Sequence, residues 1–197
     1  MSKVVLITGA SSGLGLTTAL HLHEKGYTVY GTSRNPKIYD KQYPFNFLSL
    51  ENADSISIQN CVKTVLDQSG RLDILINNAG VGIIGPMEEI ELSAVRQHFE
   101  VNCFGPLQLM QAVLPHMRLQ GEGLIINITS IAADIGLPFR GTYSAAKGAL
   151  ERMSEALRME TKAHGIRICN VAPGDFISNI AERRHYASLG KDSPYYT

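Results

Sequence analysis

The sequence predicts a doubly wound α/β fold, in which a parallel sheet carries helices on both faces. Short runs of β-branched and aliphatic residues alternate with longer amphipathic segments, an order typical of right-handed β-α-β units. Charged residues make up only 18% of the chain, below the roughly one quarter of a typical globular domain, as expected when a sheet is covered on both sides. The predicted strands cover residues 3–8, 27–32, 45–50, 72–77, 124–128 and 166–171, and the predicted helices cover residues 14–25, 53–69, 93–120 and 142–164.

Composition restricts the classes of protein that the chain can belong to. A chain of 197 residues is expected to form one domain, and a hydrophobic fraction of 44% supports a substantial core. The net charge of zero, without a basic stripe, gives no electrostatic support for binding nucleic acid or anionic membranes. No apolar run approaches the length of a membrane span. The first strand begins at once, which leaves no room for a signal peptide.

The cysteines and histidines do not form a recognisable metal or disulfide pattern. Cys61, Cys103 and Cys169 are odd in number and scattered, so they indicate a reducing cytoplasm and neither a disulfide framework nor a zinc site. The six histidines do not cluster, and His21 and His23 face different ways on a predicted helix. No bound metal is therefore expected.

The first predicted strand leads into a glycine-rich turn, GASSGLG at residues 9–15, and then into a helix. Strand, glycine turn and helix in this order form the setting of a dinucleotide-binding fingerprint. The glycines let the backbone approach a pyrophosphate, and the helix N-terminus offers unpaired N–H groups and the positive end of its dipole. The spacing is Gly-x-x-x-Gly-x-Gly rather than the commoner Gly-x-Gly-x-x-Gly. A plain tight turn before a helix is the alternative.

The second predicted strand is expected to end beside the adenosine ribose of such a cofactor. A carboxylate there would bind the ribose hydroxyls and select NAD, but the sequence has Thr32, Ser33 and Arg34. An arginine can hold a 2′-phosphate through two N–H groups at once. We therefore predict NADP(H) as the cofactor, the alternative being a solvated loop arginine. Comparable catalytic efficiencies with NADH and NADPH would contradict this prediction.

Tyr143 and Lys147 lie four residues apart in a predicted helix, and Ser130 precedes the tyrosine by thirteen positions. Residues i and i+4 share one face of a helix, so the phenol and the ammonium are expected to project into the same space. A cation beside a phenol favours the phenolate. The pair thus predicts a proton donor and acceptor for reducing a carbonyl or oxidising an alcohol. Such pairs also occur on ordinary helices, so their weight depends on the surrounding motifs.

With these motifs in order, the chain resembles the short-chain dehydrogenases/reductases from residue 3 to about residue 180. The resemblance implies a Rossmann-type fold with strand order 3-2-1-4-5-6, and one NADP-binding domain over residues 1–197. The shared motifs are TGASSGLG at 8–15, NNAG at 77–80, VN at 101–102, NITS at 127–130, YSAAK at 143–147 and PG at 173–174.

The catalytic roles of the family carry over to the matching residues. Tyr143 is implied to exchange a proton with the substrate oxygen, and Ser130 to hydrogen-bond that oxygen as charge develops on it. Lys147 is implied to hold the nicotinamide ribose and to favour the phenolate of Tyr143. Asn102 is implied to hold a water that relays protons from the lysine. A buried asparagine bonded to the backbone is the alternative for Asn102, and it is compatible with that role.

The resemblance also implies a set of cofactor-binding residues. Gly80 allows a close approach, Pro173 and Gly174 turn the chain under the nicotinamide, and Ser178 keeps the hydroxyl of a more usual threonine. The whole set is Gly9, Ser11, Ser12, Gly13, Leu14, Gly15, Ser33, Arg34, Leu50, Asn78, Ala79, Gly80, Tyr143, Lys147, Pro173, Gly174, Phe176 and Ser178.

The sequence departs from the family pattern in two places. Ser49 stands where the family often has an aspartate that contacts adenine, so we expect adenine to be recognised by the neighbouring backbone and Leu50. The family also usually continues further, with another helix and a seventh strand. Without that strand, the apolar run at 166–171 forms a poorly protected sheet edge, so we expect a fragment of a longer protein rather than cover by another chain. An intact native mass near 21.5 kDa would contradict this.

Two main functions remain open on this fold, because fold alone does not fix function. The first is an NADP-dependent carbonyl reductase or alcohol dehydrogenase, which the presence of Ser130, Tyr143, Lys147 and Asn102 favours. The second is an NADP-binding regulatory or scaffold protein with little turnover. A sugar-nucleotide epimerase or dehydratase is less favoured, since it usually has a different glycine spacing.

The substrate pocket is expected to be built from residues 81–86, residues 131–140 and the segment after Gly174. Several apolar residues in the first two segments favour a hydrophobic carbonyl or alcohol substrate: Ile83, Ile84, Ile135, Leu137 and Phe139.

The resemblance further implies a homodimer or homotetramer, assembled through helices 103–120 and 143–164. Apolar residues of the first helix permit this contact, although core packing requires the same kind of stripe. These residues are Leu107, Met110, Val113 and Leu114.

Overall fold

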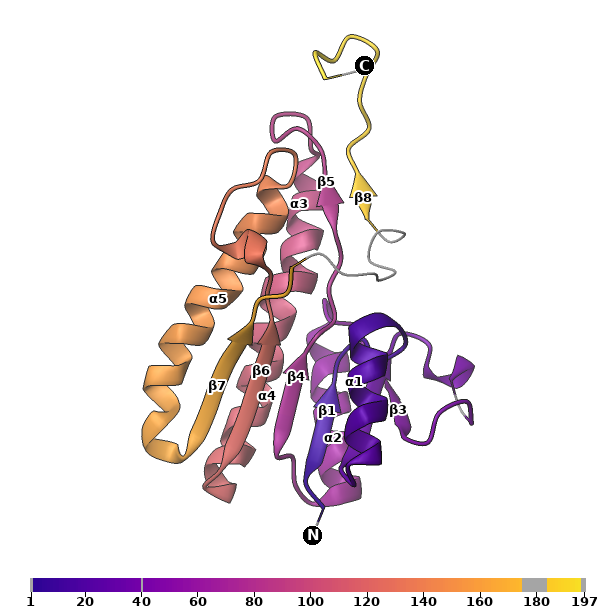
Figure 1. Cartoon of the computed structure of the whole chain (residues 1–197), viewed down its shortest axis with the longest axis vertical. Coiled ribbons are helices and arrows are strands. Elements are labelled where there is room, and N and C mark those ends of the chain that lie inside the picture. Colours follow the sequence, from indigo (N-terminus) through magenta and orange to yellow (C-terminus); the bar gives the residue numbers. More distant parts are fainter. Residues whose placement is uncertain (1, 40, 175–183, 196–197) are drawn as a thin grey trace.

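The computed structural model describes residues 2–39, 41–174 and 184–195. A six-stranded parallel sheet lies at its centre in the order β3-β2-β1-β4-β6-β7 (Figure 1). This confirms the predicted order, with β6 and β7 as the fifth and sixth strands of the sheet. The strands are β1 (Val4–Ile7), β2 (Thr28–Ser33), β3 (Asn46–Ser49), β4 (Ile74–Asn77), β6 (Gly123–Ile128) and β7 (Ile166–Val171).

The helices follow the predicted segments, with ends that differ by a few residues. Asp54 explains one such difference, because its Oδ1 accepts a hydrogen bond from the Ile56 amide at 2.9 Å and so caps the second helix. The helices are α1 (Gly13–Glu24), α2 (Ser55–Ser69), α3 (Leu92–Phe99), α4 (Gly105–Gln120) and α5 (Gly141–Thr161). The short helical turns are η1 (Pro36–Ile38), η2 (Glu100–Phe104), η3 (Ile131–Ala133) and η4 (Lys162–His164).

Helices cover both faces of the sheet, with α1 on one face and α2, α4 and α5 on the other (Figure 1). Side chains alternate along a strand, so β1 sends Val5 and Ile7 to the α1 face and Val4 and Leu6 to the opposite face. All four are almost completely buried. This alternation of apolar side chains on both faces is why the strands read as continuous apolar runs.

The apolar stripe of α4 belongs to this core. Met110, Val113 and Leu114 are buried, and Leu107 packs against the same cluster. Core packing, one of the two alternatives for these residues, therefore accounts for them. The dimer or tetramer stays a prediction, which light scattering of the purified protein would test.

A second, two-stranded parallel sheet lies beyond the carboxyl ends of the central strands (Figure 1). It pairs β5 (Ile83–Ile84) with β8 (His185–Tyr186). The hydroxyl of Ser193 donates to Glu89 at 2.7 Å, and the hydroxyl of Tyr195 donates to Glu88. These contacts bring residues 184–195 beside the loop after β4, an arrangement that the sequence did not predict.

Candidate active site

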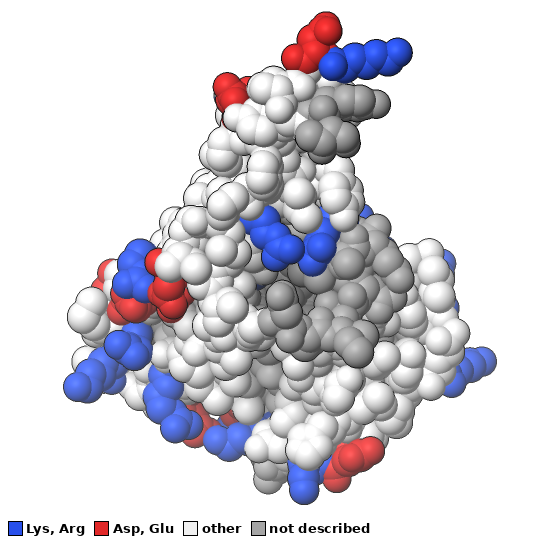
Figure 2. Space-filling model, turned by 45° about the horizontal axis from the view of Figure 1, so that its top comes forward, with Lys and Arg blue, Asp and Glu red and all other residues white. Residues whose placement is uncertain are grey.

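A cavity of about 690 Å³ opens at the carboxyl ends of the central strands, where ligands of doubly wound sheets bind. Figure 2 shows this end of the molecule hollowed near the centre of the face, with basic side chains at the edge of the hollow. Most of the predicted site residues line the cavity, namely Gly9, Ser11, Ser12, Gly13, Leu14, Ser33, Arg34, Leu50, Asn78, Ala79, Gly80, Ser130, Tyr143, Lys147, Pro173 and Gly174.

Two described residues of the predicted set do not line the cavity. Gly15 lies behind the glycine turn and Asn102 lies behind the wall formed by Gly80 and Val81. Both residues contact residues that line the cavity and so support them from behind. Phe176 and Ser178 lie outside the described residues.

The glycine turn has a backbone that only glycine accommodates well. Gly9 and Gly13 have φ angles of 66° and 54°, in the left-handed region that other residues rarely adopt. At Gly15, an added Cβ would lie 2.4 Å from both the Gly9 carbonyl oxygen and Asn78 Nδ2. The turn therefore packs directly against the end of β4.

Thr8 and Asn78 fasten the glycine turn to the neighbouring strand. The Thr8 hydroxyl accepts hydrogen bonds from the amides of Asn78 at 3.0 Å and Ala79 at 2.9 Å. Asn78 Nδ2 in turn donates to the Thr8 carbonyl at 2.9 Å. These contacts hold the carboxyl ends of β1 and β4 together and keep the turn open to the cavity.

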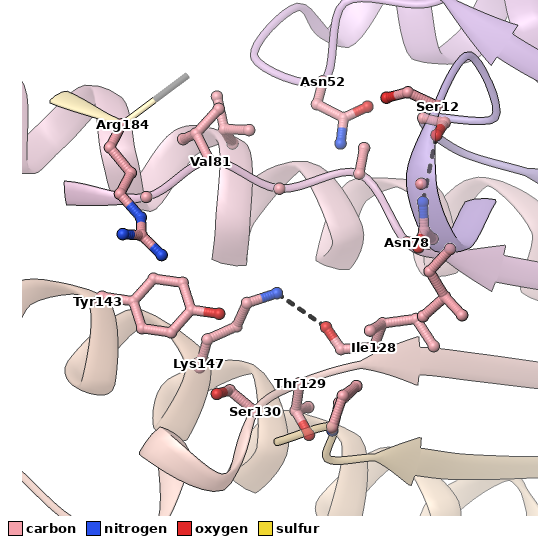
Figure 3. A pocket seen from close by; sticks show the side chains of 18 of the residues that line it. Ser12, Asn52, Asn78, Val81, Ile128, Thr129, Ser130, Tyr143, Lys147 and Arg184 are labelled. Atoms are coloured by element: carbon pink, nitrogen blue, oxygen red, sulfur yellow. Dashed lines mark hydrogen bonds between the residues drawn. The ribbon is translucent and has the colours of Figure 1, made fainter. Parts of the chain in front are cut away.

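The opposite wall at this end of the cavity comes from the ends of β2 and β3. Ser33 and Arg34 lie at one strand end, and Asn52 follows the other. Asn52 is only 6% exposed, and its Nδ2 has no hydrogen-bond partner among the described residues. Figure 3 shows its amide turned into the pocket. Because a buried unpaired donor is costly, this side chain fits a ligand with an acceptor, such as an adenine nucleotide.

Tyr143, Lys147 and Ser130 lie together in the middle of the same cavity (Figure 3). The Lys147 ammonium is buried and donates to the Ile128 carbonyl at 2.8 Å. Burial lowers the pKa of Lys147 to about 8. A lysine that can exchange its proton near neutral pH suits a proton relay. The arrangement agrees with the predicted catalytic group.

Asn102 lies in η2, a π-helical turn between α3 and α4, a feature often found at functional sites. Its Oδ1 accepts from the Val81 amide at 3.2 Å, and its Nδ2 donates to the Val81 carbonyl at 3.2 Å. Gly80 makes room for it, since an added Cβ there would lie 2.8 Å from Asn102 Oδ1 and 3.6 Å from Lys147 Nζ. Asn102 thus positions the loop after β4 beside the lysine.

His98 is a buried neighbour of this group that the sequence reading missed. Its ring nitrogens lie 3.3 Å from Asn102 Nδ2, and its ring centroid lies 5.9 Å from that of Tyr143. Burial, together with the positive charge of Lys147, lowers the pKa of His98 to about 4. His98 lies four residues before Asn102 in a helical segment, so the spacing could have indicated the contact.

We expect the unfolding free energy to fall as the pH falls through the range set by His98. Its pKa is about 4 in the folded state and 6.5 as the reference value, so the unfolded state binds more protons between these values. From pH 7 to pH 5 this single group should remove about 2 kcal/mol of stability. Urea unfolding at both pH values should show a smaller loss for His98→Gln than for the wild type. The exposed His164→Gln is the control, and equal losses in all three proteins would contradict the assignment.

The apolar part of the cavity only partly matches the prediction. Ile83, Ile84 and Leu137 line it, as expected. Ile135 and Phe139 do not line it, and their side chains are 58% and 48% exposed. The Phe139 ring instead packs edge-on against Tyr195, at a centroid distance of 5.9 Å.

Two further residues of the cavity, Arg140 and Arg184, were not predicted from the sequence. Arg140 is the residue just before α5 and precedes Tyr143 by only three positions, so its place near the tyrosine could have been expected. Arg184 could not be placed, because its position depends on the pairing of β5 with β8. Both arginines line the cavity.

Comparison with known proteins decides the family. A family model described as short chain dehydrogenase matches residues 3–187. The chain belongs to this family. It is thus a nucleotide-binding oxidoreductase of the class that acts on alcohols and carbonyls, and the predicted resemblance and Rossmann-type fold are confirmed.

Three known proteins that are similar to this short-chain dehydrogenase show how far the resemblance extends along the chain. A 3-ketodihydrosphingosine reductase from Bacteroides thetaiotaomicron is 42% identical over 194 residues, which cover 98% of this chain and 71% of the relative. A short-chain dehydrogenase structure from Streptomyces avermitilis has a TM-score of 0.90 and 36% identity, covering 96% of this chain and 72% of its own. A metagenomic short-chain oxidoreductase in complex with NADP has a TM-score of 0.82 and 30% identity, covering 89% and 84%.

Two further features of this short-chain dehydrogenase concern metals and membranes. Within residues 2–39, 41–174 and 184–195, no group of three or more His, Cys, Asp or Glu side chains is arranged to hold a metal ion. Over the same described ranges, none of the helices combines the length and apolar character needed to cross a membrane.

Proposed function

We propose that this short-chain dehydrogenase is a single NADP-binding domain that reduces a hydrophobic carbonyl compound, with Tyr143 as the acid and base. The observation that carries the proposal is the meeting of Tyr143, Lys147 and Ser130 in one cavity with the glycine turn. NADPH, when bound, supplies the hydride that reduces the carbonyl carbon. Tyr143 gives its proton to the carbonyl oxygen, and Ser130 donates a hydrogen bond to that oxygen.

Three further residues support this chemistry. The buried Lys147 lies beside Tyr143 (Figure 3) and its charge favours the phenolate that remains after proton transfer. Asn102 holds the loop after β4 at Val81, beside the lysine. Gly80 leaves space between them. Tyr143 would then regain its proton by way of Lys147.

The substrate class rests on two supports. Ile83, Ile84 and Leu137 provide apolar walls on the Tyr143 side of the cavity, and a relative carries the name 3-ketodihydrosphingosine reductase. The preference for NADP is supported by Arg34 at the end of β2 and by the related structure in complex with NADP. An NADP enzyme is expected to work mainly as a reductase.

The test is NADPH oxidation by the purified protein with a panel of neutral and charged aliphatic ketones. Saturable oxidation that depends on both ketone and protein supports the proposal. Tight NADPH binding without ketone-dependent oxidation would instead favour a regulatory or scaffold protein.

Arg34 gives a prediction about cofactor choice. Arg34→Ala should lower kcat/KM for NADPH by about 10- to 100-fold, because a charge-assisted contact to the 2′-phosphate is lost, while kcat/KM for NADH changes little. Steady-state kinetics with both cofactors measures this. Arg118→Ala, an exposed arginine on α4, is the matched control. An unchanged NADPH value in Arg34→Ala would show that the phosphate is held elsewhere.

A further inference from the structure

The charges along the cavity are unevenly distributed. Its described lining carries four cationic side chains, Arg34, Arg140, Lys147 and Arg184, against one carboxylate, Glu51. Glu51 follows β3 and Arg34 follows β2, so both lie at the adenosine end. Around Tyr143, the described lining therefore has three cations and no carboxylate.

The anionic groups of NADP do not account for the arginines near Tyr143. Under the proposed function, the pyrophosphate lies at the glycine turn and the 2′-phosphate lies at Arg34. Figure 3 shows Ser12 at one end of the pocket and Arg184 and Tyr143 facing each other at the other end, with Lys147 between the two ends. Arg184 thus lies at the Tyr143 end of the pocket, away from the glycine turn where the pyrophosphate is expected.

Arg184 is held in place by its backbone and its stem. The His185 amide donates to the Gly82 carbonyl at 3.0 Å, which fixes the chain just after the arginine. The stem lies on Gly82, where an added Cβ would meet Arg184 Cγ at 2.5 Å and Nε at 3.4 Å. Its guanidinium is turned toward Tyr143 (Figure 3). The position of Arg184 is therefore built by the β5–β8 pairing.

Neither Arg140 nor Arg184 has an ion-pair partner among the described residues. Both side chains are partly buried and both line the cavity. A guanidinium in such a place offers a fork of N–H donors that matches a carboxylate or a phosphate. Apolar walls at Ile83 and Leu137 lie in the same cavity.

We propose that the substrate is an amphiphilic oxyanion: an apolar carbonyl compound whose separate carboxylate or phosphate group is bound by Arg184 with Arg140. The proposal rests on the proposed function, since it names the substrate class of the same site. It adds a specificity-determining role for two residues outside the catalytic group. A neutral ketone of equal length would lack this contact and react less well.

The kinetic test compares an octanone with the oxo-octanoate in which a carboxylate replaces its terminal methyl group, and with the matching oxo-octyl phosphate. The wild type should prefer an acidic ketone over the neutral one by about 10- to 100-fold in kcat/KM. Arg184→Gln should reduce that ratio to within about threefold of one, and Arg184→Lys should restore part of it. The exposed Lys191→Gln is the control. Comparison of the carboxylate with the phosphate identifies the preferred group.

A binding measurement keeps this proposal separate from the proposed function. The NADPH-loaded protein is titrated with octanoate, octyl phosphate and octanol, and the fluorescence of NADPH is followed. Tighter binding of an anionic probe than of octanol, lost in Arg184→Gln while NADPH binding is retained, supports the anion site even if no ketone is reduced. Equal binding of anionic and neutral probes overturns it. The same ratio of kcat/KM for the acidic ketone to kcat/KM for the neutral ketone in the wild type and in Arg184→Gln also overturns it.

Discussion

Replacing Tyr143 with phenylalanine is expected to lower kcat for ketone reduction by about 1,000-fold while the Kd for NADPH changes by less than about threefold. A positioned general acid typically contributes 10²- to 10⁴-fold to a rate, and phenylalanine keeps the ring but cannot give a proton to the carbonyl oxygen. The ring contact with His98 would remain, since it involves the ring rather than the hydroxyl. The loss should therefore concern chemistry and not folding.

Single-turnover oxidation of bound NADPH by excess ketone measures this step directly. The control is Tyr27→Phe, which removes a hydroxyl from a partly buried tyrosine just before β2, at the opposite end of the sheet. Retention of more than a tenth of the wild-type rate in Tyr143→Phe would mean that the proton comes from another group, such as Ser130 or water. Equal NADPH binding with no oxidation by either protein would favour the regulatory function.

The parallel sheet with helices on both faces could be predicted because it depends on local patterns that repeat along the chain. Each strand of the central sheet is an apolar run, and each connection is long enough for a helix, so right-handed crossovers leave few possible orders. Among these, the resemblance to the short-chain dehydrogenases/reductases implied the order that β1, β4, β6 and β7 have. Residues at the strand ends then had to meet at one edge, which is why Ser33, Asn78 and Ser130 line one cavity.

The second sheet could not be predicted, because its strands carry almost no local signal. Each strand has two residues, and Ile83 pairs with His185 about a hundred positions later. Such short segments have no measurable periodicity. The position of Arg184, and with it the charge near Tyr143, depends on that pairing. This is the reason that the substrate class was read from apolar residues alone.

Two details of the predicted site were also beyond the sequence. The segment around Asn102 has the pattern of a continuous helix, whereas residues 100–104 form a π-helical turn. Asn102 in this turn hydrogen-bonds Val81, which is distant in sequence. Likewise, Phe139 is apolar but exposed, because its ring packs on Tyr195 rather than into the cavity. Apolar character predicted burial, and a distant contact decided its location.

Adding a single methyl group at Gly15 is expected to raise the Kd for NADPH by about 100-fold. The Gly15→Ala methyl would lie 2.4 Å from the Gly9 carbonyl oxygen and from Asn78 Nδ2, and no side-chain rotation can relieve the contact with the backbone oxygen. Gly9 must then move. The amides of the turn and of the helix N-terminus would no longer point toward the pyrophosphate. A 100-fold loss corresponds to about 2.7 kcal/mol of binding free energy.

The same substitution should also lower the unfolding free energy by about 1–3 kcal/mol, as overpacking of a tight contact usually does. Fluorescence titration with NADPH, carried out well below the melting temperature of each protein, separates the two effects. Gly190→Ala is the control, because an added Cβ there meets no atom within 4 Å. If Gly15→Ala binds NADPH as tightly as Gly190→Ala does, the pyrophosphate does not depend on this turn. The glycine spacing would then reflect packing of β4 against the turn rather than cofactor binding.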